Sequence, residues 1–228
     1  MAVPVIAAES IQVRGSGRFI LDAAYLDAVP GAVTALVGRT GAGKTTLFEV
    51  LVGRRRPDLG HVRWNGAHVA RPSHPALARL GLCYLPDRRW LPPGLSVQAT
   101  LALASRDGSD WRAIGTAFGI SEWWNRPNWT LSGGELRLTE LAFALARHPK
   151  VLVLDEPFRS LEPLHRESVA RALRRAAADG VAVLFADHDA RLVHEVADRL
   201  FSIEGGRTRL IPEFRGRPIA EWYREWPA

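Results

Sequence analysis

The sequence predicts an α/β protein built around a mainly parallel sheet, and three observations support this prediction. Five short apolar runs, near residues 33–37, 80–85, 151–155, 181–186 and 199–203, alternate with longer segments that suit helices. The first run leads directly into a glycine-rich turn and an apolar-faced helix. The composition, 47% hydrophobic and 24% charged over 228 residues, is that of a globular chain that can bury a full core.

Charge and apolar patterning narrow the class of protein. The net charge is +6, but the basic residues are scattered and form no run interleaved with aromatics, so we expect no nucleic-acid partner. No run reaches the roughly 18 apolar residues that a membrane span needs, and the first residues lack the pattern of a signal peptide. We therefore expect a cytoplasmic protein. Cys83 lies in an apolar run, which favours a small buried core residue over a reactive thiol.

The N-terminal part predicts a second, smaller sheet. Residues 3–37 and about 61–69 contain stretches with period-two alternation, separated by turn signals such as GSG and NGA. This pattern is typical of antiparallel strands, which we expect beside the parallel core.

A phosphate-binding loop follows the run at 33–37. The pattern Gly38-x-x-x-x-Gly43-Lys44-Thr45 stands between that strand and a helix that Gly53 ends. The backbone N–H groups of such a loop point at phosphate oxygens, and the lysine adds an ammonium. Lys44 is one of only two lysines among 30 Lys and Arg residues. The predicted nucleotide-binding residues are Gly38, Arg39, Thr40, Gly41, Ala42, Gly43, Lys44, Thr45 and Thr46, with the Thr45 hydroxyl on Mg²⁺.

The run at 151–155 ends in two carboxylates at the edge of the sheet where parallel strands keep their ligands. Asp155 is predicted to orient Mg²⁺ and its water, and Glu156 to polarise the attacking water. Together with the loop at 38–45, this pair predicts a catalytic phosphate site in which water is the attacking group.

A third motif, LSGGE at residues 131–135, opens a helix. Apolar residues then recur at helical spacing and predict one buried stripe: Leu138, Leu141, Ala142, Leu145 and Ala146. Two glycines are entropically costly at a helix start that a serine already caps. The pair therefore indicates that something approaches the backbone closely there.

In the order of these motifs the chain resembles the ATP-binding cassette (ABC) ATPases over nearly its whole length. The resemblance implies a P-loop NTPase with a RecA-like parallel core, a small antiparallel β subdomain and an inserted helical signature subdomain at about 88–148. It implies one nucleotide-binding domain over 1–228, with a C-terminal tail at about 204–228. His188, one residue past an apolar strand, matches the histidine that contacts the γ-phosphate. The signature residues would serve the ATP of a second copy: Leu131, Ser132, Gly133, Gly134 and Glu135.

Three positions depart from the family pattern. Asp87 replaces a glutamine, and its carboxylate is a candidate ligand for Mg²⁺ or the catalytic water. The surrounding PDRRWLP is similar to the loop of ATPases from branched-chain amino-acid importers. Glu162 replaces the usual aspartate of the loop FRSLEP. Gly15 stands where an aromatic usually stacks on adenine, for which Phe19 is the alternative ring.

The resemblance implies an ATP-hydrolysing subunit of an ABC transporter. Such a subunit would pair head to tail with a second ATPase, identical or different, on a separate transmembrane permease at the cytoplasmic face of the membrane. The alternatives are a soluble ABC ATPase acting on DNA or ribosomes, and a regulatory nucleotide-binding module. Substrate and direction of transport are not predicted, because the permease makes the solute contacts. The tryptophans of EWWNRPNW (122–129), and Trp222, Tyr223 and Trp226 of the tail, either pack in the chain or contact a partner.

Overall fold

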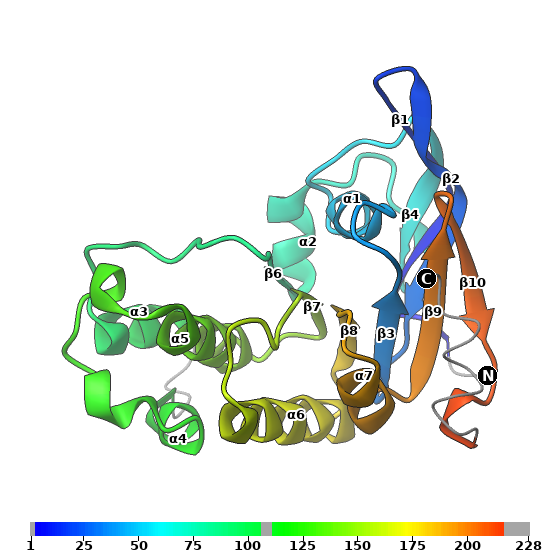
Figure 1. Cartoon of the computed structure of the whole chain (residues 1–228). Coiled ribbons are helices and arrows are strands. Elements are labelled where there is room, and N and C mark those ends of the chain that lie inside the picture. The colour runs from blue at the N-terminus through cyan, green and yellow to red at the C-terminus, as the bar shows by residue number, and fades with distance from the viewer. Residues whose placement is uncertain (1–2, 106–110, 217–228) are drawn as a thin grey trace.

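The computed structural model describes residues 3–105 and 111–216, which form two sheets and a set of helices (Figure 1). The strands are β1 (Ile6–Gly15), β2 (Arg18–Ala28), β3 (Val33–Val37), β4 (Leu59–Trp64), β5 (Ala67–His68), β6 (Leu82–Leu85), β7 (Val151–Asp155), β8 (Ala182–Ala186), β9 (Arg199–Glu204) and β10 (Arg207–Ile211). The helices are α1 (Lys44–Leu51), α2 (His74–Leu80), α3 (Val97–Ala104), α4 (Trp111–Ala117), α5 (Gly133–Ala146), α6 (Pro163–Ala178) and α7 (Ala190–Val196). Three short 3-10 helices are η1 (Ile120–Trp123), η2 (Asn128–Thr130) and η3 (Phe214–Gly216).

The larger sheet has the strand order β10-β9-β3-β8-β7-β6. The four parallel pairings from β9 to β6 confirm the five predicted parallel strands. The central strands β3, β7 and β8 are fully buried, because helices cover one face of the sheet and α1 with the smaller sheet covers the other. β10 pairs antiparallel with β9 and was not predicted. It follows a turn at Gly205 and Gly206, both with positive φ, so that the first half of the predicted tail is an edge strand.

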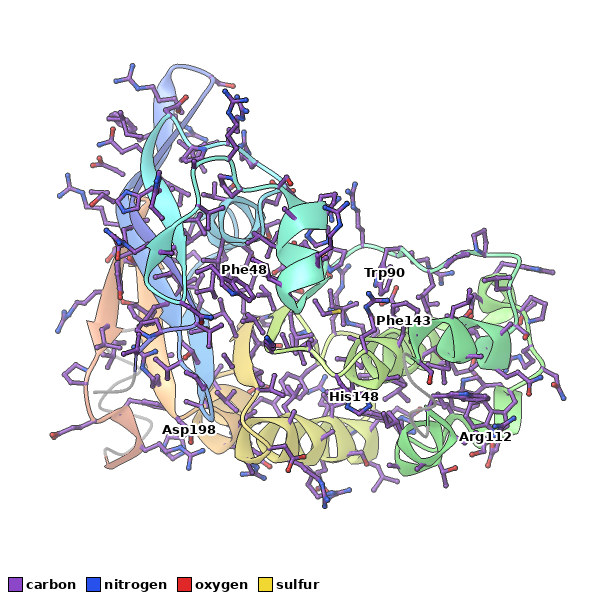
Figure 2. All side chains as sticks on the ribbon, turned by 180° about the vertical axis from the view of Figure 1, so that it is seen from behind. Phe48, Trp90, Arg112, Phe143, His148 and Asp198 are labelled. Atoms are coloured by element: carbon purple, nitrogen blue, oxygen red, sulfur yellow. The ribbon has the colours of Figure 1, made fainter. Side chains whose placement is uncertain are left out.

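The smaller sheet, β2-β1-β4-β5, is antiparallel throughout, as its alternating sequence predicts. The six-stranded sheet separates two apolar clusters. Along β3, Val33, Ala35 and Val37 belong to the cluster that includes α5, α6 and α7, whereas Leu36 belongs to the cluster beneath α1 and the smaller sheet. Phe48 of α1, in the second cluster, is fully buried (Figure 2).

α3, α4 and α5 form an arm beside the larger sheet (Figure 1). The predicted buried stripe of α5 is largely confirmed, since four of its five residues are buried and Leu145 is half-buried. Burial is not limited to that stripe, however, because nine residues of α5 are buried in all. The reason is tertiary, because α3 and α4 pack on one side of α5 while β6 and α6 pack on the other. Two charged residues, Arg137 and Glu140, are buried with it.

The tryptophans of the arm divide between packing and exposure. Trp123 is buried, and Trp124 packs edge-on against Trp111 at 5.2 Å between ring centroids. Trp129 is 66% exposed. Trp222, Tyr223 and Trp226 lie outside the described residues.

Cys83 is buried in β6, as predicted. Within residues 3–105 and 111–216, none of the helices has the length and apolar character required to cross a bilayer.

Candidate nucleotide site

The loop between β3 and α1 has the predicted glycine-dependent backbone. Gly41 and Gly43 have φ values of 82° and 105°, which L residues rarely adopt. A Cβ on Gly38 would stand 2.6 Å from the carbonyl oxygen of Ile203, so β9 leaves room only for glycine. The loop is therefore held by its own geometry and by the neighbouring strand.

Lys44 directs its ammonium into this loop. Its Nζ donates to the carbonyl oxygens of Gly38 at 2.6 Å and Arg39 at 3.1 Å. Burial lowers the pKa of Lys44, an effect opposed by the nearby carboxylates of Glu156, Asp155 and Asp187. Three carboxylates at the ends of β7 and β8 therefore favour the charged form of this ammonium.

Thr45 and Asp155 are brought together as predicted. The Thr45 hydroxyl donates to Oδ2 of Asp155 at 2.7 Å, although the two residues are 110 positions apart. Asp155 is 2% exposed, and burial raises its pKa, opposed by that hydrogen bond. A hydroxyl and a carboxylate are hard oxygen ligands that suit Mg²⁺, which usually takes one or two protein carboxylates and completes its shell with water and phosphate. The described residues hold no group of three or more His, Cys, Asp or Glu that could bind a metal ion.

Glu156 follows Asp155 in a strained conformation. Its φ is 49°, in the left-handed region that non-glycine residues avoid, and its N–H donates to the carbonyl oxygen of Ala186 at 2.9 Å. This bend turns the chain off β7 directly beside Asp155.

His188 lies just beyond β8 with a side chain that is 73% exposed. The buried Asp187 carboxylate accepts from the N–H groups of His188 at 2.8 Å and Asp189 at 3.0 Å, and burial raises the pKa of Asp187. Asp187 was not singled out from the sequence. It fixes the turn that presents the imidazole at the same end of the sheet as Asp155.

Asp87 is paired with a residue that the sequence did not suggest. Arg159 donates from Nη1 to Oδ2 of Asp87 at 2.5 Å, across 72 positions of the chain. This contact raises the pKa of Arg159, and the charge of Asp87 raises that of Asp155. Because β6 pairs parallel with β7, Asp87 lies at the same end of the sheet as Asp155, and its carboxylate is held by the loop after β7.

The signature residues form the start of α5. Ser132 Oγ accepts from the Glu135 N–H at 3.2 Å, and Glu135 accepts from the Ser132 N–H at 2.8 Å, which is a capping box. Arg126 holds the other oxygen of Glu135 at 2.9 Å. Across the described part of the chain, no hydrogen bond or ion pair joins these residues to the loop at 38–46.

The two signature glycines have different surroundings. A Cβ on Gly134 would stand 2.9 Å from the carbonyl oxygen of Ser160, whereas one on Gly133 would meet nothing closer than 3.6 Å. The sequence predicted that something approaches the backbone of this glycine pair closely. At Gly134 the approaching group is the Ser160 carbonyl of the same chain, in the loop after β7.

Near the place expected for adenine, Gly15 ends β1 and the turn Ser16-Gly17 leads into β2. Phe19 is 42% exposed, and the Arg14 guanidinium lies over its ring at 4.7 Å from the centroid. Ile20, next to it, approaches Gly43 of the loop. Phe19 therefore offers an exposed aromatic ring beside Ile20, the residue that approaches the phosphate-binding loop.

The sheet, the loop at its strand ends and the paired Thr45 and Asp155 define a nucleotide-binding protein of the P-loop class. The chain belongs to the ABC transporter family, whose model matches residues 21–159. Both the family and the α/β fold predicted from the motifs are confirmed.

Two relatives illustrate the range of the family. The chain is 36% identical over 210 residues to the zinc import ATP-binding protein ZnuC of Halorhodospira halophila, covering 90% of this chain and 75% of ZnuC. It is 31% identical over 212 residues to the lipopolysaccharide export system ATP-binding protein LptB of Acidithiobacillus ferridurans, covering 89% and 88%. The chain is therefore an ATP-binding subunit of the ABC transporter class, an ATPase that binds nucleotide.

Solved structures agree on the fold. An ATP-binding subunit of an ABC transporter superposes with a TM-score of 0.85 at 20% identity, over 97% of this chain and 99% of that chain. A nucleotide-free ATP-binding cassette gives 0.81 at 21% identity, over 96% and 98%.

Proposed function

We propose that this ATPase drives a separate transmembrane permease by closing and opening as a head-to-tail dimer at the cytoplasmic face of the membrane. The whole chain would be one nucleotide-binding domain, with residues of about 88–148 as its helical subdomain. The relatives named above are ATP-binding subunits of an import and an export system, which supports a permease partner. Because these two relatives differ in cargo and in the direction of transport, the proposal includes neither a transported substrate nor a direction.

Within one copy, residues 38–46 would bind the ATP phosphates, with Lys44 between the β- and γ-phosphates. Thr45 and Asp155 would hold Mg²⁺, a role that their 2.7 Å contact and oxygen chemistry support. Glu156 would polarise the attacking water, and His188 would contact the γ-phosphate. Asp87 would reach the metal or its water after leaving Arg159.

The observation that carries the dimer is the exposed start of α5. Ser132 and Gly133 are exposed and bound to nothing in the nucleotide loop of their own chain. The free N–H groups and the positive dipole end of a 14-residue helix suit an anion, and the γ-phosphate of a second copy is the anion that a two-fold axis would bring there. Each ATP would then join two chains, and hydrolysis would release them.

Glu156→Gln tests this model, because ATP that binds without turnover should accumulate the dimer. Size-exclusion chromatography with saturating ATP and Mg²⁺ should show a dimer that disappears when Ser132→Arg is added, while ATP binding by the monomer persists. A dimer that withstands Ser132→Arg, or a Glu156→Gln protein that stays monomeric both alone and with its permease, would contradict the proposal.

Ser96 provides a matched control for the loss of a helix cap. It caps α3 by accepting from the Ala99 N–H at 3.2 Å, the same distance as the Ser132 contact, but lies outside the signature. Ser96→Arg should therefore lower stability to a similar extent and leave the Glu156→Gln dimer intact.

A further inference from the structure

Arg137 is a buried residue of α5 that connects the arm to the sheet through several hydrogen bonds. Its side chain is 6% exposed and uses four of its five N–H donors. Nη1 donates to the Pro86 carbonyl oxygen at 2.9 Å and to Glu140 Oε2 at 3.1 Å. Nη2 donates to the carbonyl oxygens of Asp155 and, at 3.0 Å, of Glu156.

These acceptors belong to two segments of the nucleotide site. Pro86 immediately precedes Asp87, and Asp155 and Glu156 are the two carboxylate residues at the end of β7. A planar guanidinium fixes several acceptors at once in one geometry, which a lysine ammonium cannot do. One side chain of α5 therefore sets the backbone on which three candidate catalytic or metal-binding residues stand.

The loop after β6 is attached to α5 at a second point. Trp90 packs edge-on against Phe143 at 5.0 Å between centroids, and Figure 2 shows the two rings side by side. Arg137 and Phe143 thus hold residues 86 and 90 of the same loop to one helix. The position of this loop follows the position of α5.

We propose that Arg137 is a positioning residue that transmits the orientation of the signature helix to Asp87 and Glu156 of its own chain. α5 begins with the glycines proposed to meet the partner's ATP, and Arg137 lies about one turn further on. A small rotation of α5 on the partner's nucleotide moves the guanidinium, and with it the carbonyl groups of Asp155 and Glu156. This inference rests on the proposed role of Glu156 in hydrolysis.

The competing explanation is that Arg137 only stabilises the fold. Burial raises the pKa of Glu140, opposed by Arg137, so Arg137→Met alone leaves a buried carboxyl group without its cation and lowers stability. Removing both partners, as Arg137→Met with Glu140→Met, replaces the ion pair by apolar side chains of similar size and avoids that cost. Arg137→Lys keeps the charge but loses the planar fork.

The double variant separates the two explanations. If Arg137 positions the site, kcat for ATP falls about tenfold or more in the double variant, and in Arg137→Lys, while the Kd for ATP changes by less than about threefold. The Kd for ATP is measured without Mg²⁺, because Arg137 makes no contact with the loop at 38–46 but does hold the backbone of Asp155, a proposed metal ligand. A double variant that is stable and has the wild-type kcat overturns the inference.

Amide hydrogen exchange gives a readout that does not depend on turnover. Segments 86–90 and 155–157 should exchange about tenfold faster or more in the double variant, with α1 unchanged. Unchanged exchange in both segments contradicts the inference. A wild-type chain with no ATP turnover contradicts the role of Glu156 instead, and the exchange result still decides whether Arg137 holds these segments.

The Arg199–Asp27 pair provides the control. Arg199 Nη2 donates to Asp27 Oδ1 at 2.8 Å, with Asp27 6% exposed, and joins β9 to β2 at the opposite ends of the parallel strands. Arg199→Met with Asp27→Asn also removes a largely buried ion pair, but should leave kcat and the exchange of segments 86–90 and 155–157 at their wild-type values.

Discussion

Gly133→Ala and Gly134→Ala should have opposite effects on stability. Neither glycine has a positive φ, so conformational freedom does not require glycine at either position. A Cβ at position 134 would stand 2.9 Å from the Ser160 carbonyl oxygen, and relieving such a contact costs about 1–3 kcal/mol. At position 133 the nearest atom is 3.6 Å away, an ordinary contact. Alanine is also the better helix former by about 1 kcal/mol, which favours both variants equally.

The difference between the two variants is therefore about 1–3 kcal/mol, with Gly134→Ala the less stable. For a chain of this size each kcal/mol shifts Tm by about 2–4 °C, so we expect Gly134→Ala to melt roughly 6 °C below Gly133→Ala. Circular dichroism without nucleotide measures this difference. Equal melting temperatures would refute the reasoning that Ser160 requires the second glycine. Both variants should weaken the ATP-dependent dimer of Glu156→Gln, since either Cβ would displace the backbone from phosphate.

Three further predictions concern the nucleotide and the thiol. Lys44→Ala should abolish tight ATP binding and turnover, because the ammonium is lost from the phosphates, whereas Lys150→Ala, at the other lysine, should not. Calorimetry measures the Kd for ATP and a turnover assay measures kcat. Values for Lys44→Ala within a fewfold of wild type would show that the site is misassigned. Because Gly15 offers no ring at the adenine position, the binding free energy should lack the roughly 1–3 kcal/mol that an aromatic ring stacked on the base supplies. The Kd values for ATP and GTP should therefore differ by less than about tenfold. A larger preference, removed by Phe19→Ala, would assign base recognition to Phe19. Burial raises the pKa of Cys83 to about 11, so about one thiol in 10³ is ionised at pH 8. A disulfide reagent should therefore label Cys83 only when the chain unfolds, and rapid labelling of the folded chain would contradict this.

The sequence predicted the features that short-range pattern determines. The five parallel strands, the loop at 38–45 and the acidic end of β7 each occupy a few consecutive residues with a distinct polarity pattern. β10 was missed because an edge strand has no long apolar run. The adjacent Gly205 and Gly206, however, were a usable hairpin signal.

Features that depend on contacts between distant segments could not be predicted in the same way. Burial on α5 extends beyond the expected stripe because α3 and β6 also pack against the helix, which no local periodicity records. Arg137 and Glu140 were not singled out from the sequence, because the role of Arg137 depends on its contacts with Pro86 and Asp155. The pairing of Asp87 with Arg159 likewise joins residues that only the folded sheet brings together.

The six-stranded sheet divides the interior into two apolar clusters, and this division affects which substitutions the chain can accept during evolution. Side chains on successive positions of β3 lie in different clusters, so a substitution at Val33 or Ala35 is compensated among α5, α6 and α7, and one at Leu36 among residues beneath α1. Volume changes on the two sides should therefore add independently. A lineage can rebuild the helices on one side to suit new neighbours while the side chains that support the ATP loop, such as Phe48, remain as they are.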